Sequence, residues 1–401
     1  MSDLSFAAAD TLGSLNVTAT NGADAVSNAV TVDFVRDATA PIATFTSPLV
    51  AANLSTLSVS IAWSASDAGA DLATLTLQRE TAAIETPGVC ATGVNDWSAD
   101  GSATVVAASG SRTDTDLTDA TCYRYTLVAT DNVGNETTTV SPRLLVDTTA
   151  PTTPSATATG SNVYQASANA TVYFRGGVSG SIAISATSSD AQSGIGSITF
   201  SRPSGASSSG WTATPSLPAT DAVSPYALAL NWSNAAGATE LEISVVNGAG
   251  TASATNRTLT FTPDADAPSV TITAPTTAAY AASGAITLAW SESDAGSGVS
   301  SRSVQRYRAL IPESADCADV STWTADGLAT STGSPREDSG LASGYCYRYG
   351  VTATDRVGNA ASEVLSVATA IDTSAPDAPT LTFAADPAGA LYVAPNGTVY
   401  V

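Results

Sequence analysis

The clearest alternation of apolar and polar positions in this chain lies in residues 122–151, and it occurs a second time. Apolar residues occupy every second position from residue 123 to residue 129, which is the period of a half-buried β-strand. Residues 131–135 then supply Asn and Gly, which tolerate the backbone angles of a tight turn. A second strand is expected to follow over residues 137–146, so the pattern predicts a β-hairpin. Residues 346–376 repeat the whole arrangement.

Shorter runs of the same period predict strands along the rest of the chain, and no segment has the composition of a long helix. In the first third of the chain, strands are expected over residues 42–46, 57–64, 72–79, 104–107, 123–130 and 138–146. Farther along, the strands expected with most support are 181–187, 198–202, 226–232 and 241–247. Residues 80–100 are expected to form an irregular excursion. The fold class predicted from this pattern is all-β.

The repeats divide the chain into two alternating kinds of unit. Units of the first kind contain two Cys and a Trp that precedes a turn, and they occupy residues 37–147 and 264–372. We name them the first and second Cys domains. Residues 148–263 form a unit without Cys, which we name the Cys-free domain.

The two ends of the chain resemble parts of a Cys-free domain. Residues 1–36 are similar to the C-terminal part of that domain, and residues 373–401 are similar to its N-terminal part. We therefore expect two incomplete domains, and a chain that is a section of a longer array. The alternative is that neighbouring copies supply the missing strands by strand addition. Residues 175–227 have no counterpart at either end, which disfavours that alternative.

Charge excludes several classes of function. The chain has 14 Arg, no Lys and no His against 36 acidic residues, for a net charge of −22. Binding to nucleic acid depends largely on cationic side chains that contact phosphates, and binding to anionic lipid surfaces also depends on cationic side chains. No apolar run approaches the roughly 20 residues needed to span a bilayer. We expect neither a nucleic-acid partner nor insertion into a membrane.

The four cysteines occur as two equivalent pairs, Cys90 with Cys122 and Cys317 with Cys346. Four cysteines permit three connectivities, and the repeat favours pairing within each domain. The spacing does not fit a CxxC zinc or redox motif. Two structural disulfides indicate an oxidising, extracellular compartment.

Several residues carry a resemblance to known families. A Leu followed six residues later by a Tyr that begins a strand occurs twice, as Leu117 with Tyr123 and as Leu341 with Tyr347. This spacing resembles the sixth strand of fibronectin type III domains, which also keep a second-strand Trp where this chain has Trp63 and Trp290. The linker Asp-Thr-Thr-Ala-Pro and the turn Asp-Ala-Gly-Ser-Gly are similar to bacterial Ig-like repeats of large, secreted, adhesin-like surface proteins. The resemblance implies tandem Ig-like or fibronectin type III-like β-sandwiches in a linear array.

This fold would fix the side of the sheet on which the disulfide lies. Tyr123 and Tyr125 would face the core, so the alternation directs Cys122 to the opposite face of the sheet. The disulfide would then hold the excursion around Cys90 against the outside of the sheet. An antibody-type disulfide, in contrast, bridges the two sheets through the core.

The resemblance also places a group of carboxylates at one pole of each sandwich, where the incoming linker and two turns converge. The expected groups are Asp37, Asp67 and Asp131 in the first Cys domain, Asp266, Asp294 and Asp355 in the second, and Asp147 and Asp190 in the Cys-free domain, where Asn247 replaces the third acid. Ca²⁺ binds six to eight oxygens of this kind, and the resemblance to adhesins that stiffen their domain junctions with calcium makes Ca²⁺ the candidate cofactor. The other interpretation is that these Asp side chains cap turns through hydrogen bonds to backbone N–H groups.

The remaining candidate site consists of Trp97 and Trp323, each in a Trp-x-Ala-Asp-Gly context. An exposed Trp can stack on a sugar ring, whereas a Trp packed under its own loop forms a small satellite core, which is the interpretation we favour. No catalytic residues are expected. Without His there is no Ser-His-Asp or Cys-His site, and without Lys no Schiff base. The acids recur within a repeat motif, whereas a glycosidase needs its carboxylate pair only once.

The sequence therefore predicts a non-enzymatic, extracellular structural repeat protein, such as a stalk, filament or adhesin shaft on a bacterial cell surface. Its partners would be neighbouring repeats, other copies in a fibre, or an unidentified surface ligand. The alternative is a set of accessory modules that bind carbohydrate or protein. The contexts of Trp97 and Trp323 are nearly identical, which favours the structural function, because recognition surfaces usually vary between modules.

Overall fold

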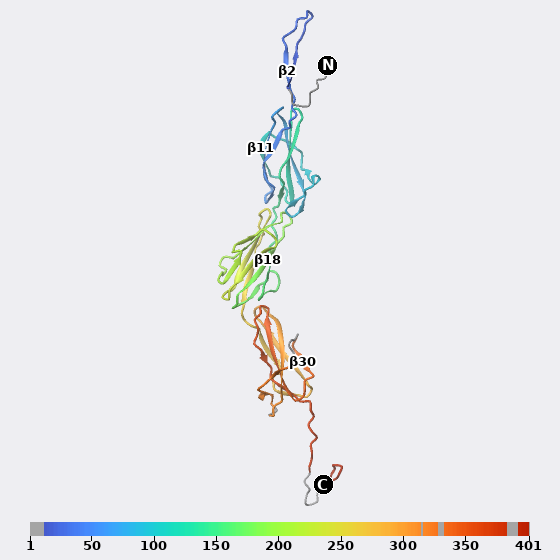
Figure 1. The fold of residues 1–401 in the computed structure, drawn as a ribbon, viewed down its shortest axis with the longest axis vertical. Coiled ribbons are helices and arrows are strands. Elements are labelled where there is room, and N and C mark those ends of the chain that lie inside the picture. Colours follow the sequence, from blue (N-terminus) through green and yellow to red (C-terminus); the bar gives the residue numbers. More distant parts are fainter. Residues whose placement is uncertain (1–11, 314–315, 328–332, 383–391, 401) are drawn as a thin grey trace. The chain divides into compact units, whose positions relative to one another are not determined.

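The computed structural model describes residues 12–313, 316–327, 333–382 and 392–400, and these residues form strands, turns and loops (Figure 1). Helical structure among them is limited to two 3-10 turns, η1 (Val94–Asp96) and η2 (Cys317–Asp319). In the part of the chain so described, no helix has the length and apolar character needed to cross a membrane. The chain divides into two compact units, Met1–Pro263 and Asp264–Val401. The all-β fold class predicted from the sequence is confirmed.

The first Cys domain is a sandwich of two sheets. The larger sheet has the strand order β10 (Thr104–Val105), β6 (Leu72–Ala82), β12 (Thr121–Asp131), β14 (Leu144–Val146) and β4 (Ala52–Leu54), with β13 (Glu136–Val140) paired to β12 and β9 (Ser98–Ala99) paired to β6. The smaller sheet has the order β11 (Ser109–Asp114), β5 (Val59–Ser66) and β3 (Ile42–Ser47). Tyr125 and Leu127 of β12 pack against Ile61 and Trp63 of β5, so the core lies between the sheets. The alternation along residues 123–129 is the inward face of β12.

The second strand of the expected hairpin is interrupted. One strand was expected over residues 138–146, but β13 ends at Val140 and β14 begins at Leu144. Pro142 lacks an N–H group and cannot continue the ladder. At the break, Ser141 donates its N–H to Tyr125 O at 2.8 Å and accepts the Tyr125 N–H at its Oγ at 2.9 Å. A side-chain hydroxyl thus replaces one backbone acceptor of the sheet.

The excursion over residues 80–100 is more regular than expected. Strand β6 continues to Ala82, and the excursion contains the hairpin β7 (Ile84–Thr86) and β8 (Val89–Cys90), followed by η1 and β9. These strands have only two or three residues, which is too short for a period of two to be visible in the sequence. The same limit explains why β4 was not expected.

The Cys-free domain is also a two-sheet sandwich. One sheet has the order β15 (Ser155–Thr159), β18 (Gly180–Thr187), β22 (Tyr226–Trp232) and β20 (Trp211–Thr214). The other has the order β16 (Val163–Gln165), β17 (Val172–Arg175), β24 (Arg257–Asp264), β23 (Thr239–Asn247), β19 (Ile195–Ser201) and β21 (Ala219–Asp221). Its core is aromatic, with the ring centroids of Phe174 and Trp211 4.9 Å apart in an edge-to-face arrangement, a favourable geometry for such pairs.

The second Cys domain repeats the plan of the first. Its sheets have the orders β25 (Ser269–Ala274), β27 (Ala285–Ser293) and β30 (Arg336–Ser339), and β26 (Ala279–Ala281), β33 (Thr369–Ile371), β31 (Tyr345–Asp355), β28 (Val299–Leu310) and β29 (Thr324–Ala325), with β32 (Val364–Leu365) paired to β31. Toward the chain ends lie two hairpins, β1 (Leu12–Val17) with β2 (Val30–Val35), and β34 (Tyr392–Val393) with β35 (Val399–Tyr400). The expected incomplete terminal domains include residues 1–11 and 383–391, which lie outside the described residues.

The Leu and Tyr spacing that carried the resemblance forms a tyrosine corner in both Cys domains. The Tyr123 hydroxyl accepts the Thr118 N–H at 2.8 Å, and the Tyr347 hydroxyl accepts the Ala342 N–H at 3.0 Å. Leu117 is buried beside this corner in the first Cys domain. A Tyr that bonds back to the chain just before its own strand is a hallmark of Ig-like sandwiches. The two-sheet sandwiches and their tyrosine corners therefore confirm the fibronectin type III-like architecture.

Both disulfides form within a domain, as Cys90–Cys122 and Cys317–Cys346. Cys90 and Cys122 belong to a small apolar cluster with Ala82 and Leu145, separate from the cluster that contains Tyr125. Cys122 therefore faces away from the main core, as the alternation predicted. The disulfide fastens the β7–β8 hairpin to the outer face of the larger sheet.

Candidate functional site

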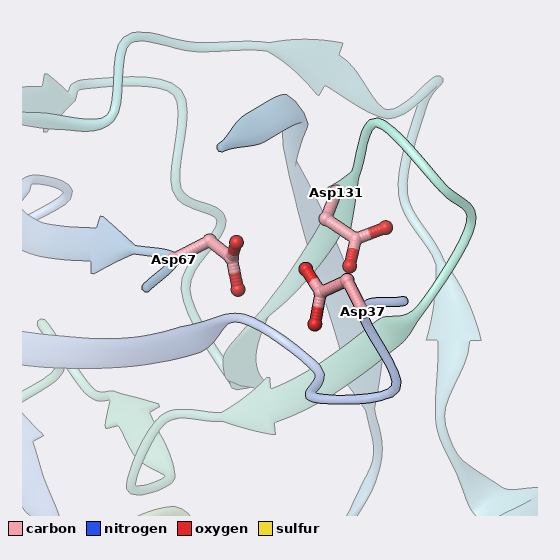
Figure 2. Close-up of side chains that lie close together, drawn as sticks. All are labelled: Asp37, Asp67 and Asp131. Carbon is pink, nitrogen blue, oxygen red and sulfur yellow. The ribbon is translucent and has the colours of Figure 1, made fainter. Parts of the chain in front are cut away.

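Three carboxylates of the first Cys domain meet at one end of the sandwich. Asp37 lies just after β2, Asp67 follows the last residue of β5, and Asp131 is the last residue of β12. Figure 2 shows their carboxylates turned toward one another from three separate segments, and one oxygen of each lies within 4.8 Å of the others. The structure thus brings together the three residues that the sequence grouped.

A glycine makes this close approach possible. A Cβ atom at Gly69 would lie 2.1 Å from Asp37 Oδ2, so a larger residue would displace the carboxylate. The adjacent Ala70 donates its N–H to Asp37 Oδ2 at 2.5 Å, and Gly69 donates its N–H to Asp67 Oδ2 at 2.9 Å. The turn that follows β5 therefore holds two of the three carboxylates.

Asp131 is held by its own turn. Its Oδ1 accepts the backbone N–H groups of residues 133–135, and its Oδ2 accepts the Asn135 side-chain amide at 2.7 Å. Burial acts to raise the pKa of Asp131, but the hydrogen bonds from the Asn135 side chain and from the backbone of the turn outweigh it and lower the pKa. The turn-capping interpretation therefore holds for Asp131. It accounts for only one oxygen of Asp67, because Oδ2 accepts the Gly69 N–H whereas Oδ1 is buried with no hydrogen-bond partner.

The corresponding group in the second Cys domain is Asp264, Asp294 and Asp355. The expectation of Asp266 was wrong, because Asp264 is the buried last residue of β24 whereas Asp266 is exposed in the following loop. The sequence carried the correct signal: Asp264 lies four residues before Pro268, as Asp37 lies four residues before Pro41.

A glycine and a backbone N–H group position the second group of carboxylates as they position the first. A Cβ atom at Gly296 would lie 2.5 Å from Asp264 Cγ, and Ser297 donates its N–H to Asp264 Oδ2 at 2.7 Å. The Asn359 amide donates to Asp355 Oδ2 at 2.7 Å and to the backbone oxygen of Asp264 at 3.0 Å. The Ser297 hydroxyl is buried without a hydrogen-bond partner.

At the corresponding pole of the Cys-free domain, hydrogen-bond donors of the protein itself contact the two carboxylates. The Asn247 amide donates to Asp147 Oδ2 at 2.8 Å and to Asp190 Oδ2 at 3.3 Å. Ser193 adds a backbone N–H at 3.1 Å and its hydroxyl to the same oxygen of Asp147. Two carboxylates bridged by an amide have no need of a cation, so this domain provides an internal comparison for the other two.

The donor set of the Cys domains fits a hard divalent cation. Three carboxylates this close repel one another when all are ionised, and a bound cation removes that repulsion. Carboxylate and carbonyl oxygens are the ligands that Ca²⁺ prefers. In the first Cys domain, the buried and unpartnered Oδ1 of Asp67 is the atom that the protein's own hydrogen bonds leave unsatisfied.

The two Trp residues lie beside the disulfides rather than at the poles. Trp97 packs against the cluster of Cys90 and Cys122, and Trp323 against that of Cys317 and Cys346. The Arg124 guanidinium lies 4.5 Å from the centroid of the Trp97 ring, and the Arg348 guanidinium lies 4.3 Å from that of Trp323. In each case an arginine covers one ring face, and the rest of the side chain is partly buried, which agrees with a satellite core under the loop.

Sequence reasoning missed a partly buried ionic network that occurs in both Cys domains. In the first domain, Arg79 Nη1 donates to both carboxylate oxygens of Asp114 at 2.9 and 3.1 Å, and the Tyr125 hydroxyl donates to Asp114 Oδ2 at 2.9 Å. Arg306, Asp338 and Tyr349 repeat it in the second. Because Asp114 belongs to the smaller sheet and its two partners to the larger, the network joins the sheets. The identical Arg, Asp and Tyr in both domains were the available signal.

The network shifts the pKa values of Tyr125 and Asp114. Burial, and then the hydrogen bond to Asp114, raise the pKa of the Tyr125 hydroxyl far above its ordinary value. Burial acts to raise the pKa of Asp114 as well, but its hydrogen bonds from Tyr125, from the backbone of Asp116 and from Arg79 lower it. Asp114 therefore stays ionised at neutral pH. The arrangement is a structural brace, since all of its groups are engaged with one another.

No protein-family model matches this sequence, and no curated protein matches it at the level of sequence. Solved structures do match. A 1.5-MDa bacterial ice-binding adhesin is 13% identical, over 84% of this chain and 100% of that one, with a TM-score of 0.31. The Escherichia coli adhesin FdeC is 14% identical, over 84% and 98%, also with a TM-score of 0.31. The fibronectin(III)-like modules of Clostridium thermocellum CbhA are 14% identical, over 56% and 95%, with a TM-score of 0.27. These are proteins to which the chain is similar, and its assignment as tandem Ig-like, fibronectin type III-like sandwiches rests on the sheets and tyrosine corners described above.

Proposed function

We propose that this chain is a non-enzymatic structural repeat protein, a section of a stalk or adhesin shaft outside a bacterial cell, and that the acidic pole of each Cys domain binds Ca²⁺. The observation that carries the proposal is the recurrence of the same three-carboxylate pole at equivalent positions of both Cys domains. A feature built into every second module serves the array, whereas a recognition or catalytic site need be present only once.

The composition and the disulfides support the class of function. The chain has no Lys and no His, so neither a His-dependent nucleophilic site nor a Lys Schiff base can form. The two disulfides suit an oxidising extracellular environment. The partners are then neighbouring repeats or other copies of the chain.

The location of the carboxylates indicates what calcium would add. Asp37 lies on the segment that enters the first Cys domain, whereas Asp67 and Asp131 belong to turns of the sandwich itself. A cation held by all three would tie the incoming segment to the domain. Asp264, Asp294 and Asp355 would hold the ion in the second Cys domain. Such a tie resists a force applied along the chain, which is the demand on a shaft.

The number of bound calcium ions can be measured directly. Titration calorimetry of the purified chain with CaCl₂ should give two sites, one for each three-carboxylate group. Asp131→Asn and Asp355→Asn should each remove one site, while Asp221→Asn, on a strand of the Cys-free domain, should leave both. A wild-type chain that takes up no calcium at millimolar concentration would refute the metal part of the proposal.

The mechanical part has a separate test. When the chain is pulled by its ends in a single-molecule force experiment, each sandwich should unfold as its own event, and the Cys domains should require more force with calcium than with chelator. Because the cysteines of the first domain are 32 residues apart, reduction should add roughly 110 Å to the length that this domain releases. Domains that unfold without a measurable force peak would contradict a mechanical role.

A further inference from the structure

The first Cys domain and the Cys-free domain lie in the same compact unit, Met1–Pro263, and contact each other outside their linker. The Gly88 N–H, at the tip of the β7–β8 hairpin, donates to the backbone oxygen of Gln192 at 2.7 Å. The Gln192 side-chain amide donates in turn to Asp119 Oδ2 at 3.0 Å. One residue of the Cys-free domain is thus bonded through its backbone and through its side chain to two separate loops of the Cys domain.

The backbones approach closely at two glycines. Gly88 has φ +79°, which side chains rarely adopt, and a Cβ atom there would lie 3.1 Å from the backbone oxygen of Ser193. A Cβ atom at Gly248 of the Cys-free domain would lie 3.0 Å from Asn53 Nδ2 of the first Cys domain. Asn53 donates that amide to Gly248 O at 3.4 Å. The contact therefore has a fitted shape in addition to its hydrogen bonds.

The hairpin that makes this contact depends on the disulfide for its position. Strands β7 and β8 pair with each other as a separate two-stranded sheet and join neither sheet of the sandwich. Cys90, at the end of β8, is bonded to Cys122 in the larger sheet. Arg143 adds hydrogen bonds from both terminal nitrogens to Gly88 O at 3.4 Å. Among the contacts that hold the hairpin tip, the disulfide is the covalent one.

We propose that the β7–β8 hairpin is a docking surface for the turn of residues 190–194 in the following Cys-free domain, and that the Cys90–Cys122 disulfide keeps the hairpin in place for docking. The disulfide then has a second role besides stabilising its own domain: it sets the angle at the junction between two modules. This junction needs no metal, because the pole of the Cys-free domain is closed by Asn247 and Ser193. The proposal is therefore independent of the calcium sites proposed above.

Hydrogen exchange of the Gly88 amide tests the proposal, because its hydrogen bond crosses the junction. The whole chain is used, with chelator present throughout so that calcium has no influence. The Gly88 amide should be protected in the wild type. Gln192→Ala should accelerate its exchange about tenfold or more, since it removes a hydrogen bond to a charged group. The matched control is Gln78→Ala, whose amide bonds Arg79 O within its own domain, and it should leave the Gly88 rate unchanged.

A second variant tests the anchor. Cys90→Ala combined with Cys122→Ala should abolish the protection of Gly88 while the Tyr125 amide, bonded to Ser141 Oγ in the main core, stays protected. Docking is overturned if the Gly88 amide exchanges freely in the oxidised wild type, or if Gln192→Ala leaves its rate unchanged. The role of the disulfide is overturned if the double variant retains full protection of Gly88.

Discussion

At the scale of single residues, the poles of the two domain types differ at the residue that ends one strand. The Cys domains have Asp131 and Asp355 at the end of the strand where the Cys-free domain has Asn247. An amide donates hydrogen bonds to its two neighbouring carboxylates, whereas a third carboxylate repels them. This position therefore separates a pole in which an amide bridges two carboxylates from a pole of three carboxylates.

Asn247→Asp should convert the Cys-free pole into a calcium-dependent one. In chelator we expect the free energy of unfolding of this domain to fall by about 1–3 kcal/mol, because the hydrogen bonds that Asn247 donates to its two neighbouring carboxylates and to the Thr149 backbone oxygen are lost. Calcium should restore most of the loss. Denaturant unfolding followed by Trp fluorescence measures the change, since Trp211 and Trp232 lie in the core of this domain. If calcium leaves Asn247→Asp unaffected, the donor set does not select a cation.

Acid should destabilise the Cys domains through Asp114 and Asp131. The pKa of each is lower in the folded chain than its ordinary value, which is about 3.9 in an unfolded chain. As the pH falls, the unfolded state takes up protons first, so this stability is present above about pH 4 and is lost as the pH falls through the folded pKa. Unfolding free energies at pH 5 and pH 3 should show the loss, and Asp114→Asn should show a smaller one. If the wild type and this variant lose the same free energy of unfolding, Asp114 is not a source of the pH dependence.

The sequence could predict the members of the first pole but not the ionic brace. The acids of the pole lie in turns that follow recognisable strands, and a fixed distance to Pro41 marks Asp37. The brace depends on register: Arg79 lies directly opposite Tyr125 on paired strands, and Asp114 reaches them from the other sheet. Such a contact between sheets leaves no local pattern, and Tyr125 looks like an ordinary core residue.

At the scale of elements, strand length decided what could be predicted. β12 and β22 extend over seven or more residues, so their alternation is visible. β4 has three residues and pairs in parallel with β14, and so short a segment shows no period. The interruption at Ser141 and Pro142 was signalled by the proline, which cannot donate to a sheet.

The disulfide should stabilise its own domain in addition to placing the hairpin. Closing a loop of 32 residues contributes about 3–4 kcal/mol to the free energy of unfolding on the chain-entropy account. Cys90→Ala with Cys122→Ala should lower the stability of the first Cys domain by that amount, as measured by denaturant unfolding. The fold itself should survive, because Tyr125, Leu127 and Ile61 belong to a separate core. A domain that no longer folds at all would show that the satellite cluster is required for the main core.

At the scale of the whole molecule, acidity is concentrated in one kind of module. The first and second Cys domains carry net charges of −9 and −7, whereas the Cys-free domain carries −1. Stability in an array of modules is close to a sum of module and junction terms. Each module should therefore respond to ions according to its own charges and its own pole.

Calorimetric melting separates calcium binding from general screening of charge. At a free calcium concentration of about 100 times the dissociation constant, linkage adds roughly 2.7 kcal/mol to a domain with one site, which raises the melting temperature of a domain of this size by about 10 °C. The transitions of the two Cys domains should shift by that amount relative to chelator, and the Cys-free transition should stay in place. NaCl at equal ionic strength is the control, because it screens repulsion between exposed charges, whatever the arrangement of the carboxylates. If NaCl reproduces the calcium shift, the three-carboxylate poles act only as part of a negative surface. If calcium shifts the Cys domains and NaCl does not, general screening of charge does not explain the shift, and the shift should then be absent from a domain whose pole lacks its third carboxylate.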